Sequence, residues 1–293
     1  MKVDEASEEL REAVYAARQA GLKIRETWMK TRCRETQVSS TVTKSNTADL
    51  QTETDRLCEE LIVKHLHEKF PNHKFIGEEE VATKGDEGFE VTDEPTFIID
   101  PIDGTTNFFR SVLSCSTLIA FMVKKEIVAA VIVDAIQCEI FYAEKSKGSY
   151  VQGLSTEGLE LVGEPRRMST SGEKDSTLAI VATDIGYQRE PKEVDQFLAM
   201  QRTFLVNGRV RGFRITGGCG LGLAYIADGR TDVYIELYSP YIWDFASGAL
   251  LVTEAGGMVC DPRGGPLNLS GRSIFAAASK ELGDQIMGLV KDL

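Results

Sequence analysis

The chain has 293 residues, of which 42% are hydrophobic and 27% charged, a balance that fits a folded protein of one large domain or two closely packed lobes. Its formal net charge of −12 argues against nucleic acid or an anionic membrane as a partner, and an acidic protein that binds phosphate needs cations in its site. Six scattered cysteines without a CxxC pair indicate neither a zinc site nor a disulfide framework, and the acidic start is not typical of a signal peptide, so we expect a cytoplasmic protein.

Two amphipathic helices are expected first in the chain. Apolar residues recur at helical spacing from about 7 to 31 and again from about 55 to 70. Thr54 fits the N-cap of the second helix, and capping of the first turn is enough to explain Asp55 on the residues alone. The polar stretch 32–48 predicts an exposed loop or hairpin, and it is our candidate for a segment that gates the site.

Two short strands then run into acidic residues. The strand at 74–77 meets three acids, Glu78 to Glu80, which are usually solvated but here lie where a sheet edge is expected. The strand at 97–99 meets Asp100, Pro101 removes a ladder hydrogen bond, and Gly104 allows a sharp turn into a helix. Carboxylates, a free carbonyl and N–H groups should converge there, able to bind a hard cation and a phosphate. An acidic turn that merely caps a helix is the plainer alternative.

The remaining segments predict a layered fold with mixed helices and strands. Strands are expected at 116–123, 127–134, 139–143, 148–152, 178–183 and 231–237, helices at 192–207, 221–227, 241–254 and 281–289. The irregular stretch 153–176 is the best boundary between lobes of about 1–152 and 153–293. Because strict βαβ alternation is missing, we expect an α/β (α+β layered) fold with a large, mostly antiparallel sheet.

Five motifs, in this order, resemble the signature of the inositol monophosphatase family. They occupy residues 48–55, 76–79, 100–107, 243–248 and 253–257, and the likeness covers nearly the whole chain. Each motif alone is a weak signal, whereas five in order are highly specific. The resemblance implies a single catalytic domain over 1–293, an αβαβα sandwich of the lithium-sensitive sugar-phosphatase type, and a homodimer.

The resemblance also implies a magnesium centre. One Mg²⁺ would be held by Glu78, Asp100 and the Ile102 carbonyl, and a second by Asp100, Asp103 and Asp244. A third, weakly held ion near Glu78 is neither required nor excluded. Oxygen ligands suit Mg²⁺, and two dications would relieve the repulsion among the four acids.

Catalysis in the resembled family uses a metal-activated water. Carried over, Glu78 and Thr105 orient the water that attacks phosphorus, Asp55 holds Thr105, and the second ion stabilises the leaving oxygen. This role for Asp55 replaces simple capping. The N–H groups of Gly104 and Thr105 would receive phosphate oxygens.

Substrate choice is expected to depend on the second half of the chain. The residues expected to contact the substrate are Asp103, Gly104, Thr105, Gly217, Gly218, Cys219, Glu236 and Asp244. Glu236 stands where inositol-specific members bind sugar hydroxyls; a rim acid without a ligand is its plain alternative. Close relatives have Gly-Thr-Ala or Gly-Ser-Ala where this chain has Gly217-Gly218-Cys219, and the spacing from Glu236 to Asp244 is one residue longer.

The resulting prediction is a Mg²⁺-dependent phosphomonoesterase that hydrolyses inositol monophosphates to inositol and phosphate. Rival substrates for the same chemistry are fructose 1,6-bisphosphate, 3′-phosphoadenosine nucleotides, NADP and histidinol phosphate. A non-catalytic regulator that binds metal or phosphate is the rival from another class. Lithium inhibition is implied by the resemblance alone.

Overall fold

The structure, a computed structural model, describes residues 1–34, 41–44, 50–84 and 89–290. Its α-helices are α1 (Glu8–Arg32), α2 (Glu53–Lys69), α3 (Glu78–Lys84), α4 (Thr105–Phe109), α5 (Pro191–Val206), α6 (Cys219–Ala227), α7 (Ile242–Glu254) and α8 (Lys280–Val290). Two 3-10 turns are η1 (Val3–Glu5) and η2 (Ser176–Leu178). No helix in these ranges is both long and apolar enough to cross a lipid bilayer.

Two large sheets organise the strands. The seven-stranded sheet has the order β3 (Lys74–Gly77), β4 (Thr96–Asp103), β5 (Ser116–Val123), β6 (Glu126–Asp134), β7 (Glu139–Glu144), β8 (Gly148–Leu154) and β9 (Leu161–Arg167). The five-stranded sheet has the order β11 (Gly212–Ile215), β10 (Ile180–Thr183), β12 (Val233–Leu237), β14 (Ser273–Ala277) and β13 (Met258–Cys260). A small hairpin pairs β1 (Thr41–Thr43) with β2 (Leu50–Thr52).

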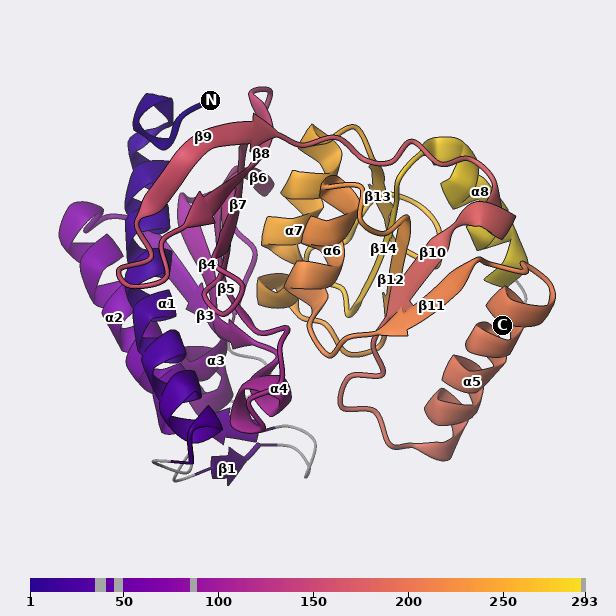
Figure 1. The fold of residues 1–293 in the computed structure, drawn as a ribbon, viewed down its shortest axis with the longest axis horizontal. Coiled ribbons are helices and arrows are strands. Elements are labelled where there is room, and N and C mark those ends of the chain that lie inside the picture. Colours follow the sequence, from indigo (N-terminus) through magenta and orange to yellow (C-terminus); the bar gives the residue numbers. More distant parts are fainter. Residues whose placement is uncertain (35–40, 45–49, 85–88, 291–293) are drawn as a thin grey trace.

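Helices and sheets alternate in five layers, as Figure 1 shows from left to right. Helices α1 and α2 cover one face of the seven-stranded sheet, and α6 and α7 fill the space between the two sheets. Helices α5 and α8 cover the outer face of the five-stranded sheet. The predicted αβαβα sandwich and the large, mostly antiparallel sheet are therefore confirmed, since β3 and β4 form the one parallel pair among the described strands of that sheet.

Hydrophobic burial fixes this layering. The middle core joins apolar side chains of β4–β8 with those of α6 and α7, for example Leu118, Phe141, Leu223 and Phe245, each fully or almost fully buried. At about 25 cal/mol per Å² of apolar area removed from water, such side chains each contribute roughly 1.5–3 kcal/mol. A helix that is apolar on most of its surface, as α6 is, can only be stable in such a central layer.

Some local expectations differ in detail. The second helix begins at Glu53, not at 55, because Thr52 rather than Thr54 is its N-cap: the Asp55 carboxylate accepts the Thr52 N–H at 2.9 Å. The lobe boundary near residue 152 stays a prediction, and the seven-stranded sheet itself continues through β9 to Arg167. Of the stretch 32–48, residues 35–40 and 45–48 lie outside the described residues; Thr41–Thr43 belong to the β1–β2 hairpin.

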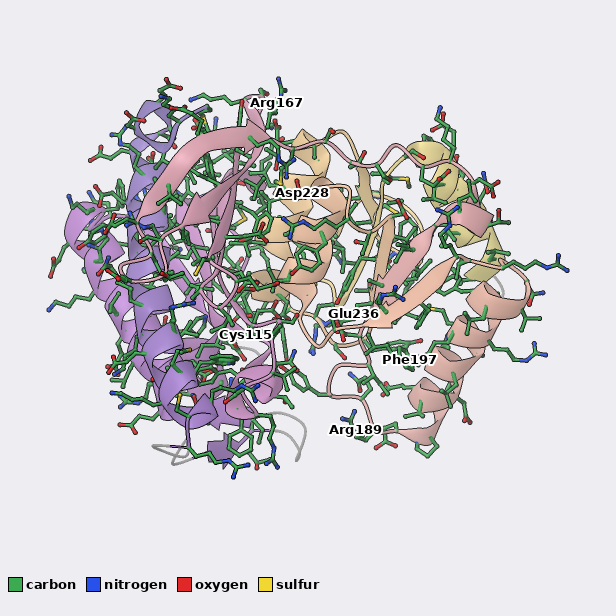
Figure 2. All side chains as sticks on the ribbon, in the orientation of Figure 1. Cys115, Arg167, Arg189, Phe197, Asp228 and Glu236 are labelled. Carbon is green, nitrogen blue, oxygen red and sulfur yellow. The ribbon has the colours of Figure 1, made fainter. Side chains whose placement is uncertain are left out.

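An ion-pair network joins the two halves of the molecule. Arg230, after α6, pairs bidentately with Glu139 of β7 (2.6 and 2.7 Å) and donates to Asp228. Arg166 of β9 also reaches Asp228 at 2.5 Å. Figure 2 labels Asp228 near Arg167, at the end of the interface opposite Arg189. A pocket lined by Arg189 and Glu236 lies toward that other end, between the same two halves.

Candidate metal and phosphate site

The acidic residues meet because β3 and β4 are parallel. Ile76 is opposite Ile98, and Gly77 is opposite Ile99, so the carboxyl ends of both strands lie at one sheet edge. Glu78 follows β3 at this edge and Asp100 continues β4. An irregularity in the pairing with β5 between Asp100 and Asp103 is centred on Pro101, which has no N–H to give to the ladder.

Gly104 makes the turn out of β4 possible. Its backbone is left-handed, with φ of 82° and ψ of 41°, and it is the N-cap of α4. A Cβ at this position would lie 2.7 Å from the Ser114 carbonyl oxygen and 2.8 Å from that of Gly217. Both the conformation and the close backbone approach require glycine, as the sequence predicted for the turn.

Three carboxylates converge where this turn faces α7. Asp100, Asp103 and Asp244 each place one oxygen within 4.8 Å of the others. Asp244 comes from the first turn of α7, where it accepts the Tyr241 N–H at 2.6 Å. Burial raises the pKa of Asp103 to about 7, and burial and neighbouring carboxylates raise the pKa values of Asp100 and Asp244 well above their usual range. The three acids can therefore all be ionised at the same time only if a cation beside them offsets their mutual repulsion.

Glu78 adjoins this cluster and has a cationic partner. After burial, the Glu78 charge is the largest cause of the raised pKa of Asp100. Lys44 Nζ lies 2.9 Å from Glu78 Oε1 and 3.1 Å from Glu79 Oε1. Glu78 therefore lies at the sheet edge with Asp100, as one of the three acids was expected to. Lys44 was assigned to the exposed loop by its polar neighbours, and only the β1–β2 pairing brings it to this edge.

The acids after β3 begin a helix rather than a solvated loop. Glu59 of α2 accepts the N–H groups of Glu79 and Glu80, both at 2.9 Å, and so caps the start of α3. Glu79 is buried, and burial raises its pKa to about 8 although Lys44 opposes the shift. Sequence reasoning missed Glu59, because its partner lies twenty residues away on another element.

Asp55 and Thr105 are in contact. Thr105 Oγ1 lies 3.1 Å from Asp55 Oδ1 and 3.0 Å from the Ile102 carbonyl oxygen, and both are acceptors for the one hydroxyl proton. The other Asp55 oxygen accepts the Thr52 N–H and hydroxyl. Burial raises the pKa of Asp55 to about 6. Asp55 thus caps α2 and also contacts Thr105, so both contacts exist in the structure, and its role in catalysis stays a prediction.

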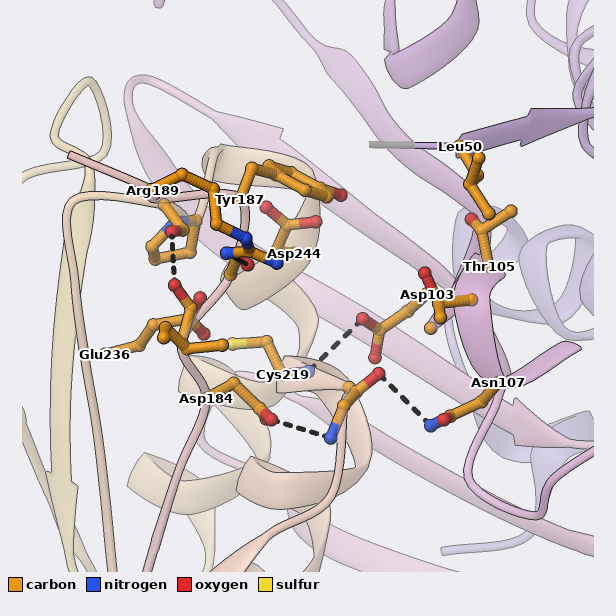
Figure 3. A pocket seen from close by; sticks show the side chains of 18 residues that line it. Leu50, Asp103, Thr105, Asn107, Asp184, Tyr187, Arg189, Cys219, Glu236 and Asp244 are labelled. Carbon is orange, nitrogen blue, oxygen red and sulfur yellow. Dashed lines mark hydrogen bonds between the residues drawn. The ribbon is translucent and has the colours of Figure 1, made fainter. Parts of the chain in front are cut away.

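The glycine turn before α6 is held by side chains from three directions. Asp103 accepts the Cys219 N–H (3.2 Å) and the Gly220 N–H (2.8 Å), a favourable place for a carboxylate at a helix start. Asp184 accepts the Gly217 N–H at 2.6 Å, and Asn107 Nδ2 donates to the Thr216 and Gly217 carbonyl oxygens (Figure 3). Sequence reasoning ended the strand at Thr183 and missed Asp184, although an acid directly after a strand was the signal used for Asp100.

These residues enclose a pocket of about 290 Å³. Figure 3 shows Asp103, Thr105 and Asn107 on one side and Asp184, Glu236 and Arg189 on the other. The predicted substrate contacts that line it are Asp103, Gly104, Thr105, Gly217, Gly218, Cys219, Glu236 and Asp244. Tyr187 and Arg189, from the loop between β10 and α5, also line it and were not among the predicted residues.

The connection between Glu236 and Asp244 has a defined conformation. Tyr238 is left-handed, with φ of 74°, an uncommon state for an aromatic residue. Arg272 then fixes the loop: its Nη2 donates to the Ser239 carbonyl oxygen at 2.7 Å, and its guanidinium packs on the Tyr241 ring. Asp244 accepts the Tyr241 N–H, so this connection delivers Asp244 to the acid cluster.

The donor set fits a hard divalent cation. Asp100 Oδ1 is buried without a hydrogen-bond partner, an orphaned acceptor that costs free energy unless a cation or donor meets it. The convergent side-chain ligands are oxygens, which is the set that Mg²⁺ prefers. In this structure the Ile102 carbonyl oxygen lies within hydrogen-bond distance of the Thr105 hydroxyl, 3.0 Å away.

Comparison with known proteins agrees with this geometry. Residues 6–293 match the inositol monophosphatase family. The chain belongs to the inositol monophosphatase family. It is 37% identical over 280 residues to inositol monophosphatase 2 of Solanum lycopersicum, covering 96% of this chain and 97% of that protein. It is 35% identical to human inositol monophosphatase 2, with 92% and 88% covered.

Solved structures give the same result at the level of the fold. The extragenic suppressor protein suhB of Bartonella henselae superimposes with a TM-score of 0.81 at 28% identity, over 98% of this chain and 99% of that chain. The resemblance read from the five motifs is therefore confirmed, and the αβαβα layering of this chain is that of inositol monophosphatase family members.

Proposed function

We propose that this protein is a Mg²⁺-dependent phosphomonoesterase that hydrolyses inositol monophosphates to inositol and phosphate. The observation that carries the proposal is one pocket with two walls of different chemistry. Asp103 and Asp244 on one side belong to the acid cluster, while Gly217–Cys219 and Glu236 form a wall suited to an alcohol. Family membership and the names of the relatives support the same activity.

Magnesium would be held by the residues that the motifs single out. We assign one ion to Glu78, Asp100 and the Ile102 carbonyl and a second to Asp100, Asp103 and Asp244, with a third, weaker site near Glu78. When bound, Mg²⁺ activates a water, draws in phosphate oxygens and stabilises charge on the leaving oxygen.

The protein's own groups orient the reactants. Thr105 donates its proton to the Asp55 carboxylate, 3.1 Å away, which turns the lone pairs of its hydroxyl toward the pocket. Thr105 and Glu78 can then each accept a hydrogen bond from the attacking water and hold it in line with phosphorus. The N–H groups of Gly104 and Thr105, both at the pocket, receive phosphate oxygens.

The opposite wall selects the alcohol. Glu236 accepts hydrogen bonds from ring hydroxyls, and the turn 217–219 sets the depth of the pocket. At Gly218 a hydroxyl residue would have little room, because a Cβ there already lies 3.1 Å from Asp103 Oδ2. Polyol recognition therefore depends on Glu236 and on backbone groups of the turn rather than on a hydroxyl at 218.

Further proposals follow from the family alone. They are inhibition by lithium, a homodimer and a cytoplasmic location. We expect small phosphate esters as substrates and no binding to nucleic acid, since the net charge is −12.

A phosphate-release panel tests the proposed function. Purified protein with Mg²⁺ is assayed on inositol 1-phosphate, fructose 1,6-bisphosphate, a 3′-phosphoadenosine nucleotide, NADP, histidinol phosphate and p-nitrophenyl phosphate. The highest kcat/KM is expected for inositol 1-phosphate, and EDTA abolishes it. Preference for another ester would replace the substrate, and metal binding without turnover on any ester would replace the activity.

A further inference from the structure

Three buried polar side chains form a cluster at the wall of the pocket proposed to bind the alcohol, which we call the alcohol wall (Gly217–Cys219 and Glu236). Tyr234 and Glu236, two residues apart on β12, point to the same face of the sheet. Asp184 follows β10, the parallel neighbour of β12. Tyr234 Oη lies 2.6 Å from Glu236 Oε2 and 3.3 Å from Asp184 Oδ2, and all three residues are buried. The phenol therefore stands between two carboxyl groups.

The single O–H group of a phenol cannot donate a hydrogen bond to two carboxylates at once. A phenol has a single O–H donor, and two ionised carboxylates this close in a buried site repel each other strongly. A proton on one of the two acids removes the repulsion and completes the hydrogen bonding. The protonated acid then donates to Tyr234 Oη, and Tyr234 donates to the other, ionised carboxylate.

The donors around the two acids decide which one is ionised. The Gly217 N–H donates to Asp184 Oδ1 at 2.6 Å, which favours the carboxylate, although burial still raises the pKa of Asp184 to about 6. Burial, and after it the Asp184 charge, raises the pKa of Glu236 well above its usual range. The proton therefore belongs on Glu236.

Other groups that face the pair do not reverse this order. Cys219 of α6 adjoins Tyr234, Arg189 lines the same pocket, and Asp103 and Asp244 face Glu236 from β4 and α7. Bound cations would offset the charges of Asp103 and Asp244. The two largest causes of the raised Glu236 pKa, burial and Asp184, would remain.

We propose that Asp184 is a positioning residue of the alcohol wall: through Tyr234 it keeps Glu236 a neutral carboxylic acid facing the substrate, and through Gly217 it fixes the glycine turn. The proposal rests on the proposed function in taking a polyol as the group that faces Glu236. A neutral acid offers its free oxygen to a ring hydroxyl without placing a further negative charge beside the phosphate ester.

Infrared difference spectroscopy tests the proton directly. In the Mg²⁺-loaded protein at pH 7, the C=O band of a protonated carboxylic acid is expected in the wild type and missing in E236Q. In D184N the neighbouring charge is gone, so this band should titrate away at a lower pH than in the wild type. No band assigned to Glu236 at pH 7, or a D184N band that titrates as in the wild type, would overturn the proposal.

Kinetics give a second, independent readout. E236Q keeps a neutral acceptor, so its KM for inositol 1-phosphate should rise by less than about threefold, against about tenfold for E236A, which loses a hydrogen bond. An E236Q variant as impaired as E236A would contradict a neutral Glu236. If D184N does not fold, Y234F serves instead, because loss of the phenol must shift the frequency of the Glu236 band.

The two proposals can fail separately. A wild-type protein that hydrolyses p-nitrophenyl phosphate but no inositol monophosphate would refute the proposed substrate. The infrared measurement would still decide the protonation of Glu236, since it needs no turnover.

Discussion

Thr105 Oγ1 lies 3.1 Å from Asp55 Oδ1, a contact that joins the first residue of α4 to the first turn of α2. Fifty residues separate the two in sequence, and both belong to motifs of the family. Because the other Asp55 oxygen accepts the Thr52 N–H, the carboxylate is held in place beside the Thr105 hydroxyl.

The first prediction concerns this hydroxyl. T105A should lower kcat by about 10²-fold, because it removes an acceptor that orients the attacking water, with a small change in KM. T105S keeps the hydroxyl and should recover most of the activity. Steady-state kinetics on inositol 1-phosphate measure both; equal activity of T105A and T105S would show that the hydroxyl has no role in turnover.

A pH dependence follows from Asp55. Its pKa in the folded protein is raised to about 6 by burial, so the carboxylate that holds Thr105 is lost as the pH falls below that value. The kcat of the wild type should therefore fall on the acidic side, at about pH 6 or lower when cations at the site favour the charged form. D55N should be slow at every pH and lack this limb. A wild-type profile without an acidic limb, or the same limb in D55N, would exclude Asp55 as its source.

Metal binding should release protons. The pKa of Asp103 is raised to about 7 by burial, and the pKa values of Asp100 and Asp244 are higher than usual, so protons compete with Mg²⁺ below neutral pH. Affinity for Mg²⁺ should increase with pH through about 7. Calorimetry at pH 6 in buffers of different ionisation enthalpy counts the protons released, and a count of zero would contradict the prediction.

The substitution Asp100→Asn distinguishes a role of this residue in metal binding from a role in folding. The substitution removes one charge from a repelling cluster, so the metal-free protein should melt at an equal or higher temperature than the wild type. Stabilisation by Mg²⁺, about 2.7 kcal/mol at one hundred times the Kd, should be lost together with turnover. D134N, which alters a buried acid hydrogen-bonded to Gln137 outside the cluster, is the matched control and should keep the Mg²⁺ response. Retained Mg²⁺-dependent turnover in D100N would refute the assignment.

Gly104→Ala tests the turn. Left-handed backbone costs roughly 1–2 kcal/mol for alanine, and the approach of two carbonyl oxygens adds an overpacking cost of about 1–3 kcal/mol. Gly163 has φ of 69° but open space where the methyl group of an alanine would lie, so G163A should show the backbone cost alone. Denaturant unfolding compares the two; equal losses would mean that the crowded turn relaxes freely.

The sequence alone was enough to predict those parts of the candidate site whose residues lie close together in the chain. Asp100, Asp103 and Gly104 lie within five residues of one another. The turn that they form depends on the missing N–H of proline and on the backbone freedom of glycine, and both can be recognised from the sequence. The layering could be predicted because mixed periodicities and the family motifs both indicate it. Glu78 was placed at the right edge because a strand precedes it.

The residues that were missed act through distant partners. Asp184 becomes part of the wall only through the parallel pairing of β10 with β12, whose residues are about fifty positions further along. Lys44 reaches Glu78 only because β1 pairs with β2. The Thr52 cap was misplaced by two residues because Thr52 and Thr54 are equally suitable, and the reach of Asp55 decides between them.

Asp103 links the two walls of the pocket. One of its oxygens belongs to the acid cluster, while its carboxylate also accepts N–H groups from the first two residues of α6. A cation bound to the Asp103 carboxylate changes the hydrogen bonds that this carboxylate accepts from the turn before α6, where the alcohol would bind. Coupling free energies are reciprocal, so the polyol should tighten metal binding by the same factor by which the metal tightens polyol binding.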